Sequence, residues 1–384
     1  MAPATLATAP AAPKTQGSDK KAPTMLVPFT RAAREHLEPF VDESKALTTS
    51  SQQMGPYDVA AYGFLRGIYL QIEVSGGTGS TTVAVKEDAP WNLIQEVSVI
   101  DVNGAPIFGP LSGYDLYLLN KYGGHAWAAD PRQSPGFTAP VVGASASGNF
   151  NMLLRIPIEI AARDGLGALP NQNAASTYKV RLTLASADDV YSTKPTNLGT
   201  ARVRMHLDAW SQPTGSDLRG NVNAQVPPAV GTTMFNSKQI FNLASGQQTT
   251  QLKRVGNYIR NLIFVNRDAS NGTRATGATN FPDPVTLSWD TRPLLTAVPK
   301  MLMRHLMQQR TGYTGTAETA GGPDNGVFVV DFAHDFDGKI GAELRDGWLG
   351  TVQSTRLEIQ GSFSAASVLT VLTTDVSPAG EVFV

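Results

Sequence analysis

The chain has 384 residues, of which 31 are basic and 32 acidic, so its formal charge at pH 7 is −1. This length suggests two domains or one large all-β unit, and a charge near zero disfavours the basic surface with which proteins hold nucleic acid. The absence of cysteine excludes disulfides, thiolate metal sites and cysteine nucleophiles. The N-terminus lacks an apolar core of signal-peptide length and no run approaches about 18 apolar residues, so we expect a chain that crosses no membrane and is made in the cytoplasm.

The N-terminal region is predicted to be an arm followed by a short helix. Residues 1–24 are mainly Ala, Pro, Thr and Lys, which carry too little apolar surface to order themselves, and we predict a mobile arm. Thr30 could then cap a helix over about 31–38, which Pro39 would end. The apolar positions of this helix form one stripe: Ala33, Leu37 and Phe40. So short a helix needs a partner surface, either on its own domain or on a neighbouring molecule.

From Tyr57 onward the chain is typical of strands and turns. Apolar and polar residues alternate in short runs, which clusters of Gly, Pro, Asn and Asp separate. The clearest runs are 68–74, 97–102, 178–184 and 203–209.

Only two later stretches are predicted to be helices. In residues 111–124, Ser112 is a plausible N-cap and paired glycines follow the last turn. In residues 298–312, Pro299 lies in the first turn and Gly312 at the end. Each helix follows a strand that carries an aspartate.

The two halves of the chain resemble each other. The segment YGFLRGIYLQIEVSGG (62–77) has a counterpart in GNYIRNLIFVNRDASNG (256–272). Matched positions include Arg66 with Arg260, Asp101 with Asp290, 163–165 with 336–338, 179–182 with 354–357, and Asp208 with Asp375. The spacing between matched positions decreases slowly along the chain, as accumulated loop differences would make it. We therefore predict one β-rich module in two copies.

This duplication predicts the architecture. We expect an N-terminal segment at 1–54, a first module at 55–212, a linker at 213–229 and a second module with the C-terminal tail at 230–384. Each module has about eight candidate strands, and strands in that number hide their edges in a two-sheet sandwich. The predicted fold class is all-β: two tandem eight-stranded jelly rolls, each with a short helix, after the N-terminal arm and helix.

The amino-acid sequences of two segments resemble those of a known family. Residues 88–124 (DAPWNLIQEVSVIDVNGAPIFGPLSGYDLYLLNKYGG) and 337–363 (DGKIGAELRDGWLGTVQSTRLEIQGSF) resemble the double jelly-roll major capsid proteins of tectivirus-like phages. These phages are tailless icosahedral double-stranded DNA viruses with an internal membrane. The resemblance covers about residues 25–384 and implies a homotrimer. Its six jelly rolls would form a nearly hexagonal capsomer that tiles the shell over the membrane.

The same resemblance implies the surroundings of the protein. Its partners would be neighbouring capsomers, penton and minor capsid proteins and, peripherally, the internal membrane, without direct contact to nucleic acid. It would lie in the virion after assembly in the host cytoplasm. Neither enzymatic activity nor a cofactor is expected. The residues implied to face inward are Phe29, Arg31, Arg34, Leu37 and Phe40.

Candidates for chemistry are few. The five histidines form no His-x-x-x-His pair, and none accompanies a Gly-x-Ser-x-Gly motif. Asp335 and Asp337 resemble the start of a calcium loop, but Lys339 and Ile340 occupy positions that need oxygen ligands. A strand end followed by an Asp-Gly turn is the favoured interpretation, although an ion shared between subunits stays open.

Two other functions remain as alternatives. The chain could be a vertex or spike protein of a virion, although no extended shaft or receptor-binding insertion is visible. It could also be a jelly-roll carbohydrate-binding protein or a glycosidase, which would need two carboxylates facing each other across a cleft. No Asp or Glu pair in the sequence stands out for that role.

Overall fold

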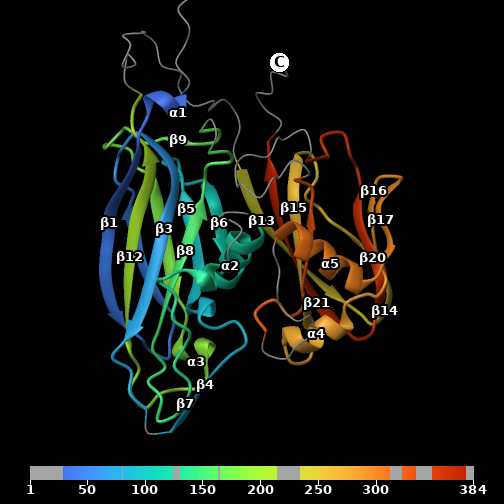
Figure 1. Ribbon diagram of the computed structural model, residues 1–384, viewed down its shortest axis with the longest axis horizontal. Coiled ribbons are helices and arrows are strands. Elements are labelled where there is room, and N and C mark those ends of the chain that lie inside the picture. Colours follow the sequence, from blue (N-terminus) through green and yellow to red (C-terminus); the bar gives the residue numbers. More distant parts are fainter. Residues whose placement is uncertain are drawn as a thin grey trace, which may run out of the picture.

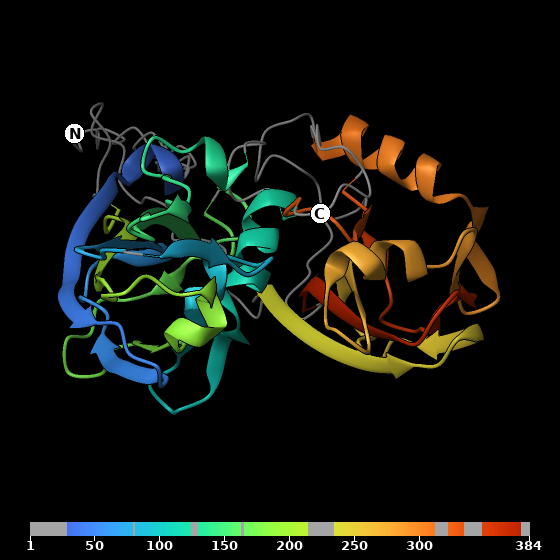
Figure 2. The ribbon, with the colours of Figure 1, turned by 90° about the horizontal axis from the view of Figure 1, so that it is seen from below.

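The computed structural model describes residues 29–79, 81–123, 130–162, 165–213, 234–311, 322–333 and 348–377. Figures 1 and 2 show two β sandwiches side by side, the first built from the N-terminal half of the chain and the second from the C-terminal half. Their strands pair antiparallel throughout the described sheets.

The first module consists of two main sheets. One has the order β1-β12-β3-β8 and the other β2-β10-β5-β6. The main strands are β1 (Glu35–Ala46), β2 (Gln52–Asp58), β3 (Phe64–Ser75), β5 (Ile94–Ile100), β6 (Pro106–Leu111), β8 (Phe150–Pro157), β10 (Lys179–Leu184) and β12 (Thr200–Trp210). Short elements complete it: β4 (Thr82–Val85), β7 (Gly143–Ala144), β9 (Leu169–Pro170), β11 (Tyr191–Thr193), η1 (Trp91–Leu93), η2 (Pro131–Gln133) and α3 (Ala187–Val190).

The second module repeats this topology. Its sheets have the orders β13-β21-β15-β18 and β14-β20-β16-β17. The strands are β13 (Met234–Leu243), β14 (Gly246–Gln251), β15 (Tyr258–Asp268), β16 (Val285–Trp289), β17 (Arg292–Val298), β18 (Val327–Asp331), β19 (Leu349–Gly350), β20 (Leu357–Phe363) and β21 (Ser367–Val376). Numbered within each module, the eight main strands lie in the same places: first, eighth, third and sixth in one sheet, and second, seventh, fourth and fifth in the other. The predicted duplication and the two jelly rolls are confirmed.

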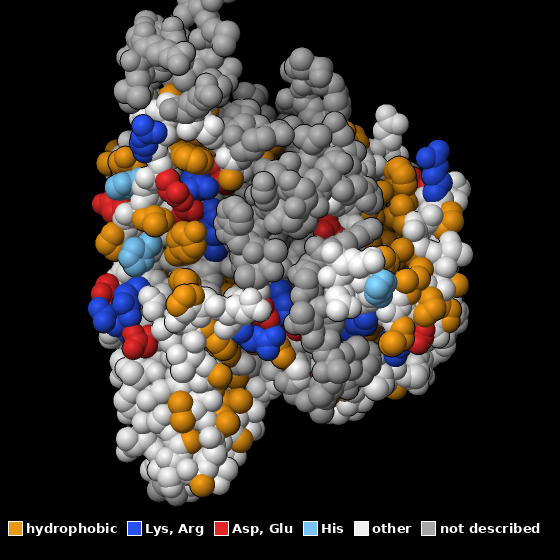
Figure 3. Space-filling model, viewed as in Figure 1, with side chains coloured by type: hydrophobic (Ala, Val, Ile, Leu, Met, Phe, Trp, Pro, Cys, Tyr) orange, Lys and Arg blue, Asp and Glu red, His pale blue; other side chains and the backbone are white. Residues whose placement is uncertain are grey.

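In the first sandwich the core comes from alternation along the central strand β12, whereas β15 and β21 of the second sandwich are buried along almost their whole length. On β12, Val203, Met205 and Leu207 are fully buried. The residues between them point outward, where Arg202 pairs with Asp42 at 2.6 Å and Arg204 with Glu73 at 2.7 Å. Figure 3 shows this mixture of basic and acidic side chains on the left of the first module. A period of two places one residue type in the core and the other in water.

The two predicted helices are confirmed. Helix α2 (Gly113–Tyr122) begins with a capping box, in which the Asp115 amide donates to Ser112 Oγ and the Ser112 amide donates to the Asp115 carboxylate. Gly123 ends it. Helix α5 (Lys300–Thr311) follows Pro299, and each helix connects the fifth and sixth main strands of its module.

A further helix, α4 (Arg274–Asn280), was not predicted. Its sequence RATGATN is rich in Thr, Gly and Asn, which are poor helix formers. Packing stabilises it instead. A Cβ added at Gly277 would lie 2.2 Å from the Asn266 carbonyl oxygen, so only glycine allows α4 to lie this close to β15. The Asn266 amide also donates to the Gly277 carbonyl at 2.8 Å.

The predicted helix over 31–38 is wrong. Helix α1 covers only Phe29–Ala32, and Glu35–Ala46 form β1, which pairs with β12 along its whole length. A short isolated helix is costly to nucleate, whereas the open edge of β12 offers a partner for every second backbone group. Strand β1 and the start of β2 also precede residue 55, the predicted first residue of the first jelly roll.

The repeat extends to a local irregularity. Arg66 on β3 and Arg260 on β15 are each the extra residue of a β-bulge opposite the last strand of their module. The bulges place Ala209 and Asp375 at corresponding positions. The match of Asp208 with Asp375 is therefore wrong by one residue, while that of the two arginines is confirmed. The match of 163–165 with 336–338 falls largely outside the described residues.

Candidate functional site: the junction between the two jelly rolls

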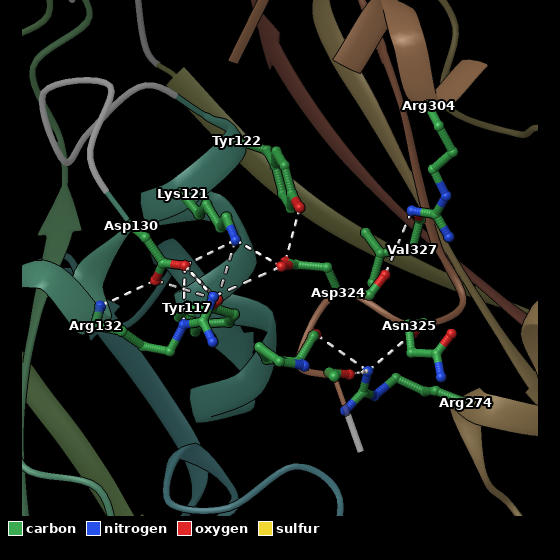
Figure 4. Close-up of polar contacts among 12 residues, drawn as sticks. Tyr117, Lys121, Tyr122, Asp130, Arg132, Arg274, Arg304, Asp324, Asn325 and Val327 are labelled. Carbon is green, nitrogen blue, oxygen red and sulfur yellow. Dashed lines mark hydrogen bonds and ion pairs between the residues drawn. The ribbon is translucent and has the colours of Figure 1, made fainter. Parts of the chain in front are cut away.

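A cluster of buried polar side chains lies where the two modules meet. Helix α2 of the first module faces α4 and the segment 322–327 of the second (Figure 4). All ten residues of α2 are buried, including Asp115 and Lys121. A helix buried on every side must have its charged residues paired by its surroundings.

Asp324 is the first centre of the junction. Lys121 Nζ lies 2.7 Å from Asp324 Oδ2, and the Tyr122 hydroxyl donates to Asp324 Oδ1 at 2.7 Å. Lys121 also lies 2.8 Å from Asp130 Oδ2, the same oxygen to which Arg132 Nε donates at 2.9 Å. Lys121 is 9% and Asp324 4% exposed, so this ion pair between modules is shielded from solvent.

Arg274 is the second centre, and its side chain is completely buried. Nη1 donates to three carbonyls of the second module, those of Gly322 (3.1 Å), Pro323 (3.1 Å) and Asn325 (2.8 Å). Toward the first module, Nε donates to Asp88 Oδ1 at 2.8 Å and Nη2 to the Glu87 carbonyl at 3.0 Å. One guanidinium thus connects segments from both halves of the chain, and its rigid fork suits this role.

Glu87 of the first module caps α4 of the second. Its carboxylate accepts hydrogen bonds from the Arg274 amide at 2.6 Å and the Ala275 amide at 3.0 Å. Thr273, at the N-cap position, makes no side-chain capping hydrogen bond. The first amides of a helix have no partner within it, so Glu87 supplies acceptors that the local sequence lacks.

Tyr114 and Lys238 complete the contact. The Tyr114 hydroxyl donates to the Pro323 carbonyl at 2.6 Å, and the Arg274 guanidinium lies 4.6 Å from its ring centre. Burial raises the pKa of Tyr114, which keeps the phenol a neutral donor. On β13, Lys238 Nζ lies 2.6 Å from Asp115 Oδ2. Beside this pair is a cavity of about 290 Å³, lined by both modules.

The junction is structural in its chemistry. Each carboxylate described above is neutralised by a nearby cation or by backbone amides. Among the described residues, no group of three or more His, Asp or Glu could hold a metal ion. The arrangement fixes two jelly rolls to each other.

Acid should weaken this junction through Asp130. Burial alone would raise its pKa, but hydrogen bonds from Arg132 and the charge of Lys121 outweigh burial and lower the pKa from 3.8 to about 2. A lowered folded-state pKa gives stability that is present above the unfolded value and lost as pH falls from about 4 to 2, at most about 2 kcal/mol before solvent screening. When pH is lowered across this range, the free energy of unfolding measured with urea should decrease less for Asp130→Asn than for the wild type. Asp58→Asn, at an exposed ion pair with Lys179, is the control, and an equal change in both variants would contradict this expectation.

The residues that the resemblance implies to face inward lie in different surroundings. Phe29 is buried and packs edge-on against Phe64 and Trp210, with ring centres 5.5 and 5.9 Å away. Phe40 packs partly on the core of the first module, and Leu37 is 56% exposed on β1.

Of the remaining predicted residues, the structure describes only Arg34 in full. Its side chain is exposed, and its amide donates to Ser211 Oγ. The Arg31 side chain, Asp335 and Asp337 lie outside the described residues.

Sequence reasoning missed the junction residues. Asp88, Arg274 and Asp324 lie in loops or at a helix start, without a motif that distinguishes them from surface charges. The one available signal was α2, whose sequence GYDLYLLNKY has no broad polar face and therefore predicts burial on all sides.

Two jelly rolls of identical strand order, fixed together by a buried polar junction, define the double jelly-roll fold. No protein-family model and no curated protein matches the sequence. Solved structures with this architecture do match. The STIV MCP has 16% identity and a TM-score of 0.60, with 90% of this chain and 98% of that chain covered.

Two further solved structures are similar. PBCV-1 VP54, fitted into a reconstruction of the virophage Sputnik, has 13% identity and a TM-score of 0.58, covering 90% of this chain and 94% of its own. The major capsid protein P2 from bacteriophage PM2 has 10% identity and a TM-score of 0.50, covering 90% and 97%. Likeness at these identities concerns the fold.

Proposed function

We propose that this chain is the major capsid protein of an icosahedral virus. The observation that carries the proposal is the duplicated jelly roll with a buried charged junction, which presents two similar wall modules as one unit. The solved structures with this architecture include a protein described as a major capsid protein. The charged groups of the junction pair with one another, as suits a building block.

The unit is a trimer in this proposal. Two similar modules in each of three chains give six similar modules around one axis, so that one gene product makes a nearly hexagonal capsomer. A closed ring limits its own growth, whereas the outer faces of the modules remain available for neighbouring capsomers. The mixed charges on the outer sheet of the first module suit lateral contacts of this kind.

The finer setting follows the resemblance to tectivirus-like phages. The capsomers tile a shell over an internal membrane, together with penton and minor capsid proteins, after assembly in the host cytoplasm. The net charge of −1 favours a wall that does not bind the genome itself. Of the residues that the resemblance implies to face inward, Arg31 and Arg34 are proposed to do so. Among the described residues, no helix has the length and apolar character of a membrane span.

Light scattering coupled to size exclusion tests the trimer. The expected particle has three times the 40.8 kDa mass of the chain. Negative-stain images should show nearly hexagonal blocks with six towers. A stable monomer at micromolar concentration would contradict the proposal, and binding or hydrolysis of glycans would favour the carbohydrate-active alternative.

A further inference from the structure

The two connecting helices occupy corresponding places but have different surroundings. Both α2 and α5 lie between the fifth and sixth main strands of their modules. Every residue of α2 is buried, and Tyr114, Asp115 and Lys121 bind residues of the second module, whereas on α5 Met301 is 78% and Leu302 45% exposed. Figure 3 shows hydrophobic side chains over the region of α5 and β17. One helix thus has a jelly roll packed against it, and its counterpart presents an apolar face.

Corresponding residues of the two helices can be assigned. Strand β6 ends at Leu111 and α2 begins at Gly113, while β17 ends at Val298 and α5 begins at Lys300. With the helix starts superposed, Tyr114 corresponds to Met301 and Asp115 to Leu302. Met301 and Leu302 therefore occupy two of the positions through which α2 contacts the second module, those of Tyr114 and Asp115.

The other side of the contact has a counterpart as well. Asp115 pairs with Lys238 on β13, the first strand of the second module. Lys238 lies opposite Leu372 on β21, three residues before Asp375. Because Ala209 and Asp375 correspond, the counterpart of Leu372 is His206.

The pairing register of β1 with β12 identifies the residue of the first module that corresponds to Lys238. His206 lies opposite Pro39 on β1, so Pro39 corresponds to Lys238. Pro39 is exposed, and Leu37, two residues earlier on the same face of the strand, is 56% exposed.

The residues at these corresponding positions differ in polarity on both the helix and the strand. Within the chain, an acid on the helix meets a lysine on the first strand of the other module. At the two surfaces that remain open, the helix carries Leu302 and the first strand carries Pro39. Where the contact within the chain has the polar pair Asp115 and Lys238, the open surfaces carry the apolar residues Leu302 and Pro39. Exposed apolar side chains of this kind are typical of an interaction surface.

We infer that α5 of one copy packs against β1 of a second copy, with Met301 and Leu302 on Leu37 and Pro39. The occupant is this same chain, since the surface that covers α2 is a jelly roll with the same topology. The contact joins different surfaces of the two copies, so it repeats around a ring until the ring closes. This inference rests on the proposed trimer and identifies its subunit interface.

Because the chain has no cysteine, crosslinking tests the contact without background. Leu302→Cys combined with Pro39→Cys, treated with a short bis-maleimide, should give covalent dimers and trimers on a denaturing gel. Each single variant should give only monomers, because 302 meets 39 and not another 302. Crosslinked single variants would overturn the head-to-tail contact. An uncrosslinked double variant with a trimeric mass would overturn the inference alone, whereas a monomeric wild type would overturn the proposed function.

A charge-pair rescue provides a second test. Leu302→Asp should weaken the trimer at least tenfold in light scattering, and adding Pro39→Lys should restore it by recreating the pair of Asp115 and Lys238. Val142→Asp, which changes a 53% exposed valine beside β7, is the matched control and should remain trimeric. Circular dichroism checks that each variant is folded. Equal dissociation of Leu302→Asp and the control, or folded Leu302→Asp trimers, would overturn the inference.

Discussion

Replacing Arg274 with methionine is expected to lower the free energy of unfolding by about 3–5 kcal/mol. The side chain is fully buried and serves Asp88 together with carbonyls from both modules, and a methionine of similar length replaces none of these hydrogen bonds. The loss comes from leaving acceptors desolvated without donors rather than from the loss of apolar contact. Urea unfolding followed by tryptophan fluorescence measures the change.

Arg202→Met is the matched control for this variant. Arg202 also makes two hydrogen bonds to an aspartate, Asp42, but both side chains are about half exposed. Water replaces the lost contacts there, so we expect little change in stability. If the two variants unfold at the same urea concentration, the junction around Arg274 does not hold the modules together as argued.

Replacing Arg66 with methionine is expected to cost a similar amount, about 3–5 kcal/mol, in the first module. Arg66 lies 2.9 Å from Glu159 Oε2, 3.2 Å from Asp208 Oδ1 and 2.8 Å from Glu35 Oε1. Glu159 and Asp208 are buried, and Arg66 is one of the cations that compensate their charge. The variant leaves these carboxylates with less compensation in an apolar setting.

The loss in free energy of unfolding caused by Arg66→Met should depend on pH. Burial raises the pKa of Glu159 and of Asp208, and the charge of Arg66 opposes this rise, so removing Arg66 raises both pKa values further. A carboxyl with a raised folded-state pKa destabilises the fold when ionised, and the penalty disappears as pH falls through that pKa. The loss should therefore be larger at pH 7 than at pH 5.

Urea unfolding at the two pH values measures this difference. Arg204→Met, which breaks a partly exposed ion pair with Glu73 on the same sheet, is the control and should show little pH dependence. If the loss in free energy of unfolding caused by Arg66→Met became larger as the pH falls, this would contradict the assigned role of Arg66.

The junction and the bulges show how the duplicated module has diverged. Arg66 and Arg260 occupy the same bulge, but Arg66 binds carboxylates of its own module, whereas Arg260 donates to the Gly123 carbonyl at the end of α2. One ancestral position thus serves internal stability in the first copy and contact between modules in the second. Strand order has been preserved while the chemistry on it has changed.

The N-terminal strand shows where sequence patterns fail. The positions of Ala33, Leu37 and Phe40 suit a helical stripe, but Leu37 and Pro39 also alternate with inward-facing residues of a strand. Over so few residues, the helical period of 3.6 and the strand period of two both fit the sequence. The strand is decided by pairing with β12, where Glu35 lies opposite Trp210 and Ala46 opposite Thr200, and this pairing is visible only in the folded molecule.

The sequence by itself determined the all-β class, the duplication and the helices α2 and α5, because alternation, turn residues and helix caps are local signals that each module carries twice. Only the tertiary structure decided where β1 and α4 lie and which charges meet at the junction. Lys121, Arg274 and Asp324 are ordinary charged residues in sequence, and their importance arises from burial beside partners that the packing of two modules brings together. Pairing across such distances depends on the relative placement of whole sheets, which no local pattern encodes.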